Sequence, residues 1–452
     1  MTTPAHRRLD EACYGIGSLA SASFAVVPGL ILLYYLTDVL AISAAIAGLV
    51  VLIPKLFDVV VNPLVGRLSD RTRSRFGARR PWIVLGGVLF PLAFMAMFWT
   101  PYSGLSAAVW VAIAFTLASM AFSFFVVPWS SLPAEIAPDS AARTSMAAWR
   151  IGFLAVAVLI SGGLAPAIID NADDTRAGYR QMALFIGAMM IAATLLVAFV
   201  GARRSTPETS LPAAPAGFRS GLSILRSSPP LQAMFWLVAL TEVASSVALA
   251  STPYIATHVL ENPSLMAPMF VMRTLVLLLT MPVWRIVAIR MGKRAALTAA
   301  LLIFAGGALL LLGLALVPAE TRLPLAIAAL SVMAIGFAGV AMLPQAMFAD
   351  ALAYETSVRG ESNVGAMVGA WNAAEAVSGG IGAAAFAFTL TAAGFVSGGP
   401  DAAVQQSAGA VLGIVAAASL LPALATLFAC VPLRRFTLAE VEVDAATGRS
   451  AQ

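Results

Sequence analysis

The chain has 452 residues, of which 60% are hydrophobic and only 11% are charged, and its formal net charge is +5. A soluble domain has roughly a quarter of its residues charged, so this composition excludes an ordinary soluble protein and indicates a membrane protein. The positive charges gather in a few short loops, as topology determinants do, so we expect no nucleic-acid partner. Cys13 and Cys430 lie far apart in apolar segments, which does not indicate a disulfide framework.

Twelve apolar stretches, separated by short breaks rich in proline, glycine and charge, are each long enough to cross a bilayer, which takes about 20 residues. We therefore predict an all-α polytopic membrane protein with twelve transmembrane helices. The first stretch follows a polar, basic N-terminus without a clear cleavage site, so we predict a retained helix. The predicted spans are 12–38, 42–68, 82–102, 105–135, 145–169, 180–202, 230–259, 264–289, 295–318, 323–350, 362–396 and 404–433.

Charge in the connections predicts the orientation of these spans. Arginines dominate every second connection, above all the segments 71–80, 203–226 and 285–294, whereas the intervening connections carry mostly acidic residues. Positive loops stay in the cytoplasm, so we predict a multi-pass protein of the cell inner (plasma) membrane with both termini cytoplasmic. That placement requires an even number of spans.

The break between the sixth and seventh spans is the longest in the chain and is rich in proline, serine and arginine. We predict an N-terminal six-helix bundle (1–202), a cytoplasmic linker (203–229), a C-terminal six-helix bundle (230–435) and a cytoplasmic tail (436–452). The loops after the second and eighth spans echo each other, because each is basic and has a glycine, Gly77 or Gly292, just before its last cations. Internal duplication of six helices is typical of secondary transporters, whose substrate site lies between the halves.

Short motifs recur along nearly the whole chain. They are Tyr14-Gly15-Ile16-Gly17, Leu33 to Leu40, Phe57-Asp58, Asn62-Pro63, Ser69 to Gly77, Arg80-Pro81-Trp82, Val127-Pro128-Trp129, Leu132-Pro133, Arg143-Thr144, Arg150, Ala349-Asp350, Tyr354 and Trp371-Asn372. These motifs resemble those of the glycoside-pentoside-hexuronide:cation symporters, the melibiose-permease branch of the major facilitator superfamily. The resemblance implies the major facilitator fold and a proton- or sodium-coupled transporter of sugars or glycosides that works by alternating access between two six-helix halves.

The resemblance also implies where the coupling cation binds. In the family, polar side chains of the second helix and a threonine of the fourth bind the cation. Here Asp58 keeps the first carboxylate, whereas Val61 and Asn62 replace an Asn and an Asp, and Ser123 stands at the threonine position. Sodium prefers several hard, anionic oxygen ligands, so we expect a proton rather than sodium as coupling ion, at a site of Asp58, Asn62, Ser123 and Lys55, with no other cofactor or metal.

Lys55 lies one helical turn before Asp58 inside an otherwise apolar run. A charge at membrane depth costs at least roughly 2.5 kcal/mol, so such residues pair with each other or line a polar path. Two interpretations stay open. Asp58 carries a proton for coupling, or Lys55 and Asp58 form a fixed ion pair that holds the second span against its neighbours.

The sugar-binding acids of the melibiose-like members are replaced here. Ala22 and Val126 stand where the family has aspartates, and Ala376 stands where it has a lysine, so a typical galactoside site is not expected. Arg150 on the fifth span is retained, and by resemblance we expect it to contact substrate.

New charges occur mid-span in the second half, with Glu242 in the seventh span, Arg273 in the eighth and Glu375 in the eleventh. In this superfamily these helices border the central cavity, so the three residues are candidates for proton relay or substrate binding. The alternative is a structural salt bridge between helices.

Two tryptophans are candidates for stacking on a sugar ring, Trp129 in the fourth span and Trp371, beside Asn372, in the eleventh. By resemblance we count all three residues among the substrate-binding candidates. The alternative is that the tryptophans only pack helices together.

The sequence contains no Walker loop, no HExxH helix and no GxSxG elbow, so we expect neither an enzyme nor a primary pump. We expect a monomeric transporter in a lipid bilayer that moves a small solute, most simply a sugar or glycoside, by proton-coupled symport. Two alternatives stay open: a facilitator or exporter of a less polar or lipid-like solute, and a membrane sensor without transport activity.

Overall fold

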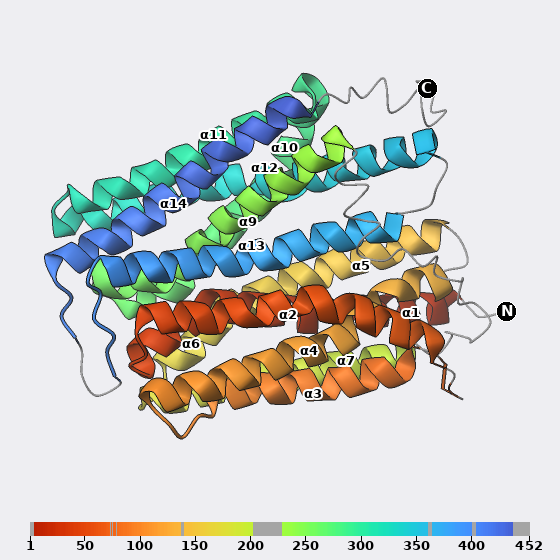
Figure 1. The fold of residues 1–452 in the computed structure, drawn as a ribbon, viewed down its shortest axis with the longest axis horizontal. Helices are drawn as coiled ribbons and strands as arrows, with labels where there is room; N and C mark the ends of the chain where they lie inside the picture. Colours follow the sequence, from red (N-terminus) through yellow and green to blue (C-terminus); the bar gives the residue numbers. More distant parts are fainter. Residues whose placement is uncertain are drawn as a thin grey trace. The chain divides into compact units, whose positions relative to one another are not determined.

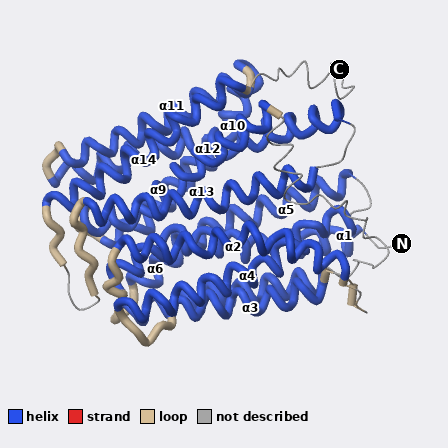
Figure 2. The backbone as a smooth tube through the Cα atoms, viewed as in Figure 1, coloured by secondary structure: helices blue, strands red, loops and turns tan. Residues whose placement is uncertain are grey.

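The computed structural model describes residues 4–72, 74, 76–77, 79–136, 140–201, 228–359, 364–399 and 404–436. These residues are almost entirely helical, with short loops and no β-strand among them (Figure 1, Figure 2). Twelve helices in the described ranges are long and apolar enough to cross a membrane, which confirms the predicted all-α, twelve-span fold. They are Asp10–Leu32, Ala44–Ser69, Arg80–Phe98, Gly104–Pro133, Ser145–Asp170, Thr175–Phe199, Pro229–Val259, Pro263–Met291, Lys293–Ala315, Ala319–Glu355, Met367–Ala392 and Ala408–Arg435.

The chain forms two compact units. Unit 1 comprises Met1–Ala213, Met266–Pro268 and Val396–Gln405, and unit 2 comprises Ala214–Leu265, Met269–Phe395 and Gln406–Gln452. The predicted linker (203–229) and tail (436–452) lie outside the described residues except at their edges, and the predicted bundle boundaries stay predictions.

Unit 1 is built around α1, which packs against α5 and α7, while α3 packs against α4 and α7, and α2 packs against α4. Its core is rich in aromatic rings, and Phe24 of α1 contacts the rings of Phe90, Phe94, Phe115 and Phe122. The helices are α1 (Pro4–Val27), α2 (Ala44–Arg71), α3 (Arg80–Phe98), α4 (Gly104–Ile136), α5 (Ser140–Leu159), α6 (Ala165–Asp170) and α7 (Thr175–Leu196), with the π-helical turns η1 (Pro28–Leu32), η2 (Tyr35–Val39), η3 (Ile160–Leu164) and η4 (Val197–Gly201).

In unit 2, α9 packs against α13 and α14, and α11 packs against α12 and α14. Lys293 at the start of α11 forms an ion pair with Asp350 of α12, with 2.6 Å between Nζ and Oδ2. The elements are α9 (Pro229–Tyr254), η5 (Ile255–Val259), η6 (Pro263–Leu265), α10 (Met266–Met291), α11 (Lys293–Leu311), η7 (Leu312–Ala315), α12 (Ala319–Arg359), α13 (Val364–Ala392) and α14 (Ala408–Arg435).

Both units end their first long helix in the same way. The π-helical turns η2 and η5 are each followed by a leucine, Leu40 or Leu260, and then by a residue with φ of 55°, Ala41 or Glu261. In each case the leucine N–H donates to the carbonyl five residues back, and the N–H two positions later donates to the carbonyl six residues back. A left-handed non-glycine residue is uncommon, so its recurrence at matching positions supports the internal duplication of the chain.

Two adjacent glycines of α11 offer a matched test of helix packing. A Cβ atom at Gly307 would lie 2.6 Å from the backbone nitrogen of Met333 in α12, whereas a Cβ at Gly306 would meet nothing within 4 Å. We expect Gly307→Ala to destabilise unit 2 by about 1–3 kcal/mol because the two helices must separate. Gly306→Ala should leave the midpoint of thermal unfolding in detergent unchanged or slightly higher. Equal midpoints for the two variants would contradict the close approach of α11 and α12.

Candidate functional site

The candidate cation site lies on α2, where Lys55, Asp58 and Asn62 follow each other at spacings of three and four residues. This spacing places their side chains on one face of the helix. Pro54 and Pro63 lie within the same helix and lack the N–H that would bond a carbonyl of the preceding turn.

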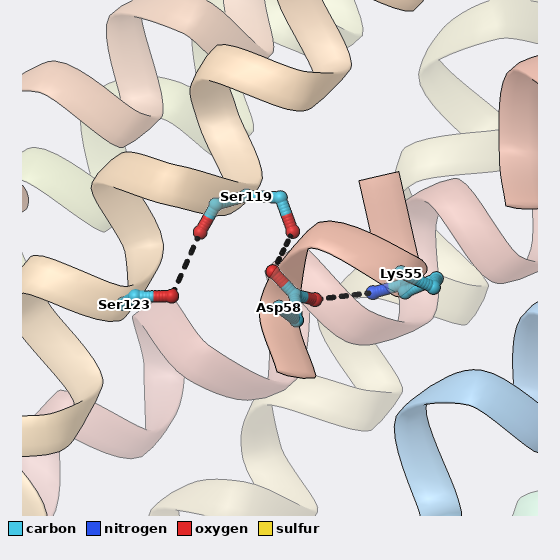
Figure 3. Close-up of polar contacts among 4 residues, drawn as sticks. All are labelled: Lys55, Asp58, Ser119 and Ser123. Atoms are coloured by element: carbon cyan, nitrogen blue, oxygen red, sulfur yellow. Dashed lines mark hydrogen bonds and ion pairs between the residues drawn. The ribbon is translucent and has the colours of Figure 1, made fainter. Parts of the chain in front are cut away.

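Asp58 is buried and its carboxylate has two partners (Figure 3). Its Oδ1 accepts a hydrogen bond of 2.5 Å from the hydroxyl of Ser119 in α4, and its Oδ2 lies 4.0 Å from Nζ of Lys55. The predicted ligand Ser123 instead donates to the backbone carbonyl of Ser119, at 3.2 Å. The residue that contacts Asp58 is therefore Ser119, one turn before Ser123 on the same face of α4, and that i, i+4 spacing was the signal for it.

Lys55 is held loosely. Its side chain is 27% exposed, and 4.0 Å is a long distance for an ion pair. Its Nζ also lies 5.6 Å from the ring centre of Phe115 and 6.0 Å from that of Phe24, where the ring faces attract a cation. If the ion pair separates, Asp58 keeps its hydrogen bond from Ser119 and Lys55 keeps its two aromatic contacts.

Asn62, one turn after Asp58, has a side-chain oxygen that is buried without a hydrogen-bond partner. A buried unbonded acceptor loses free energy unless a donor or a cation reaches it. The face of α2 therefore presents a carboxylate and a free amide oxygen in succession.

A second cluster in unit 1 joins α1, α4 and α5. The guanidinium of Arg150 lies 4.7 Å from the ring centre of Trp129 and hydrogen-bonds with the hydroxyl of Tyr14. The Trp129 ring stacks on Tyr14 at 5.4 Å and on Phe125 at 5.5 Å, and its Nε1 donates to the Tyr14 carbonyl at 3.0 Å. Arg150 forms no ion pair with a carboxylate of the described residues, so its positive charge is positioned but not neutralised.

The Tyr-Gly-x-Gly motif in α1 makes this cluster possible. A Cβ at Gly17 would lie 2.6 Å from the Trp129 indole, and a Cβ at Gly15 would lie 2.7 Å from Cβ of Trp149, next to Arg150. Only glycine permits helices to approach this closely. The motif was a family match in the sequence, but Tyr14 was not among the predicted site residues, and the signal for it was its position directly before the two glycines.

Neither tryptophan presents an open ring face in this structure. Trp129 is 0% exposed, while Trp371 is 6% exposed and stacks on Phe348 at 4.3 Å between ring centres. Both side chains pack helices together here, and their stacking on a sugar stays a prediction. Asn372, the neighbour of Trp371, is exposed.

Glu375 in α13 accepts a hydrogen bond of 2.6 Å from Nε1 of Trp371. Glu242 in α9 lies within electrostatic range of Glu375, and the two helices meet nearby through a 2.6 Å bond from Ser246 Oγ to the Gly379 carbonyl. The structure thus brings the two predicted acids of unit 2 together. Like charges that interact through a low-dielectric interior disfavour a double negative charge, so the two glutamates are candidates for exchanging one proton.

Arg273 in α10 does not join these acids. Its guanidinium lies 5.3 Å from the ring centre of Phe337 in α12, and it forms no ion pair among the described residues. The salt bridge between Arg273 and a glutamate that the sequence allowed is therefore not formed in this structure. A buried arginine costs roughly 2.5–3.5 kcal/mol at membrane depth, and a desolvated cation–π contact returns about 2 kcal/mol or more.

The glutamate pair provides a test of proton relay. If it exchanges a proton during transport, substrate-driven proton uptake into proteoliposomes should fall at least tenfold, about 1.4 kcal/mol, in Glu242→Gln or in Glu375→Gln. Glutamine keeps an oxygen that can accept from Trp371, so folding should be preserved. Glu261→Gln, the same change at an exposed loop position, serves as the control. Unchanged proton uptake in both variants would exclude the pair from coupling.

Comparisons with known proteins agree on one class. The profile of the family described as MFS/sugar transport protein matches residues 13–440. The chain is 26% identical over 259 residues to a putative glycoside/cation symporter, YagG, of Escherichia coli K12, a match that covers 57% of this chain. That match spans only about half, 56%, of the relative's own length.

Two further matches cover nearly the whole chain. A glucuronide carrier protein homolog of Escherichia coli K12 is 24% identical over 418 residues, which are 90% of this chain and 88% of the relative. A solved bacterial homolog of the human lysosomal transporter Spinster, inward-facing and unoccupied, superimposes with a TM-score of 0.66 at 12% identity. It covers 99% of this chain and 98% of that one, which shows a shared fold.

Proposed function

The chain belongs to the MFS/sugar transport protein family, in its glycoside-pentoside-hexuronide:cation symporter branch, and from that premise we propose that it is a proton-coupled symporter of a sugar or glycoside. The members of this family are membrane transporters and not enzymes. The chain would then act as a monomer in the inner membrane, with both termini in the cytoplasm, and move its solute by alternating access.

The observation that carries the proposal is the environment of Asp58. A single buried carboxylate, bonded to a neutral hydroxyl and loosely paired with Lys55, can exist with or without a proton. Without the proton it is stabilised by Lys55 and Ser119. With the proton it no longer attracts Lys55, whose ammonium keeps its two aromatic neighbours. Proton binding therefore removes the attraction between Lys55 and Asp58 within α2 and weakens the bond that Asp58 accepts from Ser119 of α4, which is a means of linking protonation to conformation.

The substrate class is supported by the names of the relatives and by Arg150. The relatives are described as a glycoside/cation symporter and a glucuronide carrier homolog. Arg150 is held by Trp129 and Tyr14 with donors that no carboxylate of the described residues occupies, so it suits hydrogen bonds to a hydroxyl-rich or anionic solute. Ala22, Val126 and Ala376 stand at the positions of the melibiose-type charges, which argues against a galactoside of that type.

Sodium is the second candidate for the coupling ion, and the unbonded oxygen of Asn62 favours it. Together with the Asp58 carboxylate and the Ser119 hydroxyl, this amide would supply oxygen ligands of the kind that hard cations take. A site with a single carboxylate binds sodium weakly in competition with water, so we keep the proton as the proposed coupling ion.

The test is uptake into proteoliposomes that contain the purified chain. Labelled methyl β-D-glucoside and methyl β-D-glucuronide are offered under an inside-alkaline pH gradient, under a sodium gradient, and under neither. We expect accumulation above the external concentration with the pH gradient alone, and its loss on addition of a protonophore. Accumulation with the sodium gradient alone would show that the coupling ion is sodium and not the proton. Equilibration without accumulation would identify a facilitator, and binding without flux would identify a sensor.

A further inference from the structure

Arg273 is a buried cation to which the described part of the chain offers no counter-charge. Arg273 is 9% exposed, and its Nη1 is buried without a hydrogen-bond partner among the described residues. The acids predicted to lie near it, Glu242 and Glu375, interact with each other and with Trp371 but form no ion pair with Arg273. Within the described ranges the guanidinium forms no hydrogen bond or ion pair, and it faces the ring of Phe337.

The Phe337 contact fixes the orientation of the guanidinium without using its donors. A ring face at 5.3 Å attracts the cation, but it accepts no ordinary hydrogen bond from the N–H groups at the guanidinium edge. Phe337 is itself packed against the hydrophobic core of unit 2, so it forms a firm support. The arrangement leaves an oriented fork of unbonded donors on α10.

An oriented, desolvated guanidinium fork is a site for an oxyanion. Carboxylates, sulfonates and phosphates accept two parallel hydrogen bonds from it and supply the missing negative charge. We propose that Arg273 binds an anionic group of the transported solute, so that the substrate is an acidic glycoside or another small organic acid rather than a neutral sugar. This inference rests on the proposed transport function and narrows its substrate class.

Arg150 adds an independent observation in unit 1. It too is held by aromatic contacts and is not neutralised by a carboxylate of the described residues. Arg150 and Arg273, which no carboxylate of the described ranges neutralises, are poorly matched to a neutral solute. The same oxyanion chemistry can come from a free solute or from an anionic lipid headgroup, and the two sources need separate arms in the test.

The experiment measures thermal stabilisation of the purified full-length protein by pairs of probes that differ only in an acidic group. The pairs are methyl β-D-glucuronide with methyl β-D-glucoside, and 3-hydroxypropane-1-sulfonate with 1,3-propanediol. A lipid arm compares nanodiscs of phosphatidylglycerol with nanodiscs of phosphatidylcholine. We expect at least one acidic probe to raise the unfolding midpoint of the wild type in a saturable way, and its neutral partner to raise it much less.

Variants locate the effect. Arg273→Gln should weaken the binding of the acidic probe at least thirtyfold, whereas Arg273→Lys should retain part of it because the charge remains. Phe337→Leu should weaken it less than Arg273→Gln, since it removes the support but not the charge. Arg285→Gln is the matched control, because it removes the same charge from an exposed position on the same helix. If Arg273→Gln does not fold, weakened binding of the acidic probe in Arg273→Lys and Phe337→Leu tests the site instead.

Each other outcome overturns the proposal. Equal stabilisation by the acidic and neutral members of every pair, or none by any acidic probe, excludes the substrate class. Acid binding of wild-type strength in Arg273→Gln, or in both Arg273→Lys and Phe337→Leu where Arg273→Gln does not fold, excludes the site. Stabilisation by phosphatidylglycerol alone identifies a lipid site. Proton-driven uptake of neutral methyl β-D-glucoside, unaffected in Arg273→Gln, would retain the symport function while rejecting the anion site, so the two failures are distinguishable.

Discussion

Asp58→Asn should abolish accumulation of solute against its gradient while leaving exchange of solute across the membrane measurable. Asparagine keeps the size of the side chain and an acceptor for Ser119, but it cannot bind and release the coupling proton. A pH difference of about two units supplies about 2.7 kcal/mol per proton, which corresponds to a roughly hundredfold accumulation. In the variant this ratio should fall to one. The measurement is uptake into proteoliposomes at fixed pH gradient, with counterflow as the assay of exchange.

The double variant Lys55→Met with Asp58→Asn separates coupling from a structural ion pair. Removing one partner of a pair leaves the other charge uncompensated, which can by itself disturb a protein. The double variant has no uncompensated charge. If Asp58 carries the proton, the double variant should exchange solute well and still fail to accumulate it. Restored accumulation would show that Lys55 and Asp58 only hold α2 in place, which is the alternative that the sequence left open.

Arg150→Gln should raise the dissociation constant for substrate by roughly thirtyfold. Truncating one side of a buried charged contact costs about 2–5 kcal/mol, and the lower value applies because Arg150 is only partly buried. Arg150→Lys should recover only part of this, since lysine cannot present a planar fork over the Trp129 ring. Binding is measured as a shift of the unfolding midpoint or by calorimetry, using whichever glycoside the uptake assay identifies.

Two tyrosine variants, one inside the Arg150 cluster and one outside it, test whether the effect depends on this cluster. Tyr14→Phe removes the hydroxyl that bonds with Arg150 and should weaken binding several-fold. Tyr102→Phe makes the same change at an exposed site outside the spans and should change nothing. Wild-type affinity in Arg150→Gln would remove this cluster from the substrate site and leave it a packing feature of α1, α4 and α5.

The spans and the family were accessible from the sequence because their signals are local. A membrane helix must satisfy its backbone within about 20 consecutive residues, so apolar length alone predicts it. The motif Tyr14-Gly15-Ile16-Gly17 and the segment from Phe57 to Pro63 are also contiguous. Spacing along one helix likewise placed Lys55, Asp58 and Asn62 on a common face.

Contacts between helices were decided only by the tertiary structure. Ser119 rather than Ser123 bonds with Asp58 because the rotation of α4 about its own axis selects one of two serines on the same face. Glu375 pairs with Trp371 and interacts with Glu242, and Arg273 lies over Phe337, because the crossings of α9, α10, α12 and α13 set which charges meet.

Apolar length therefore predicted the twelve spans, and the residue types alone identified the ionisable groups inside them. Which of those groups neutralise one another depends on ångström-level packing between residues far apart in the chain, and only the folded structure decided it. The physical reason is that hydrophobic length and helical spacing are properties of one segment, whereas an ion pair is a property of two.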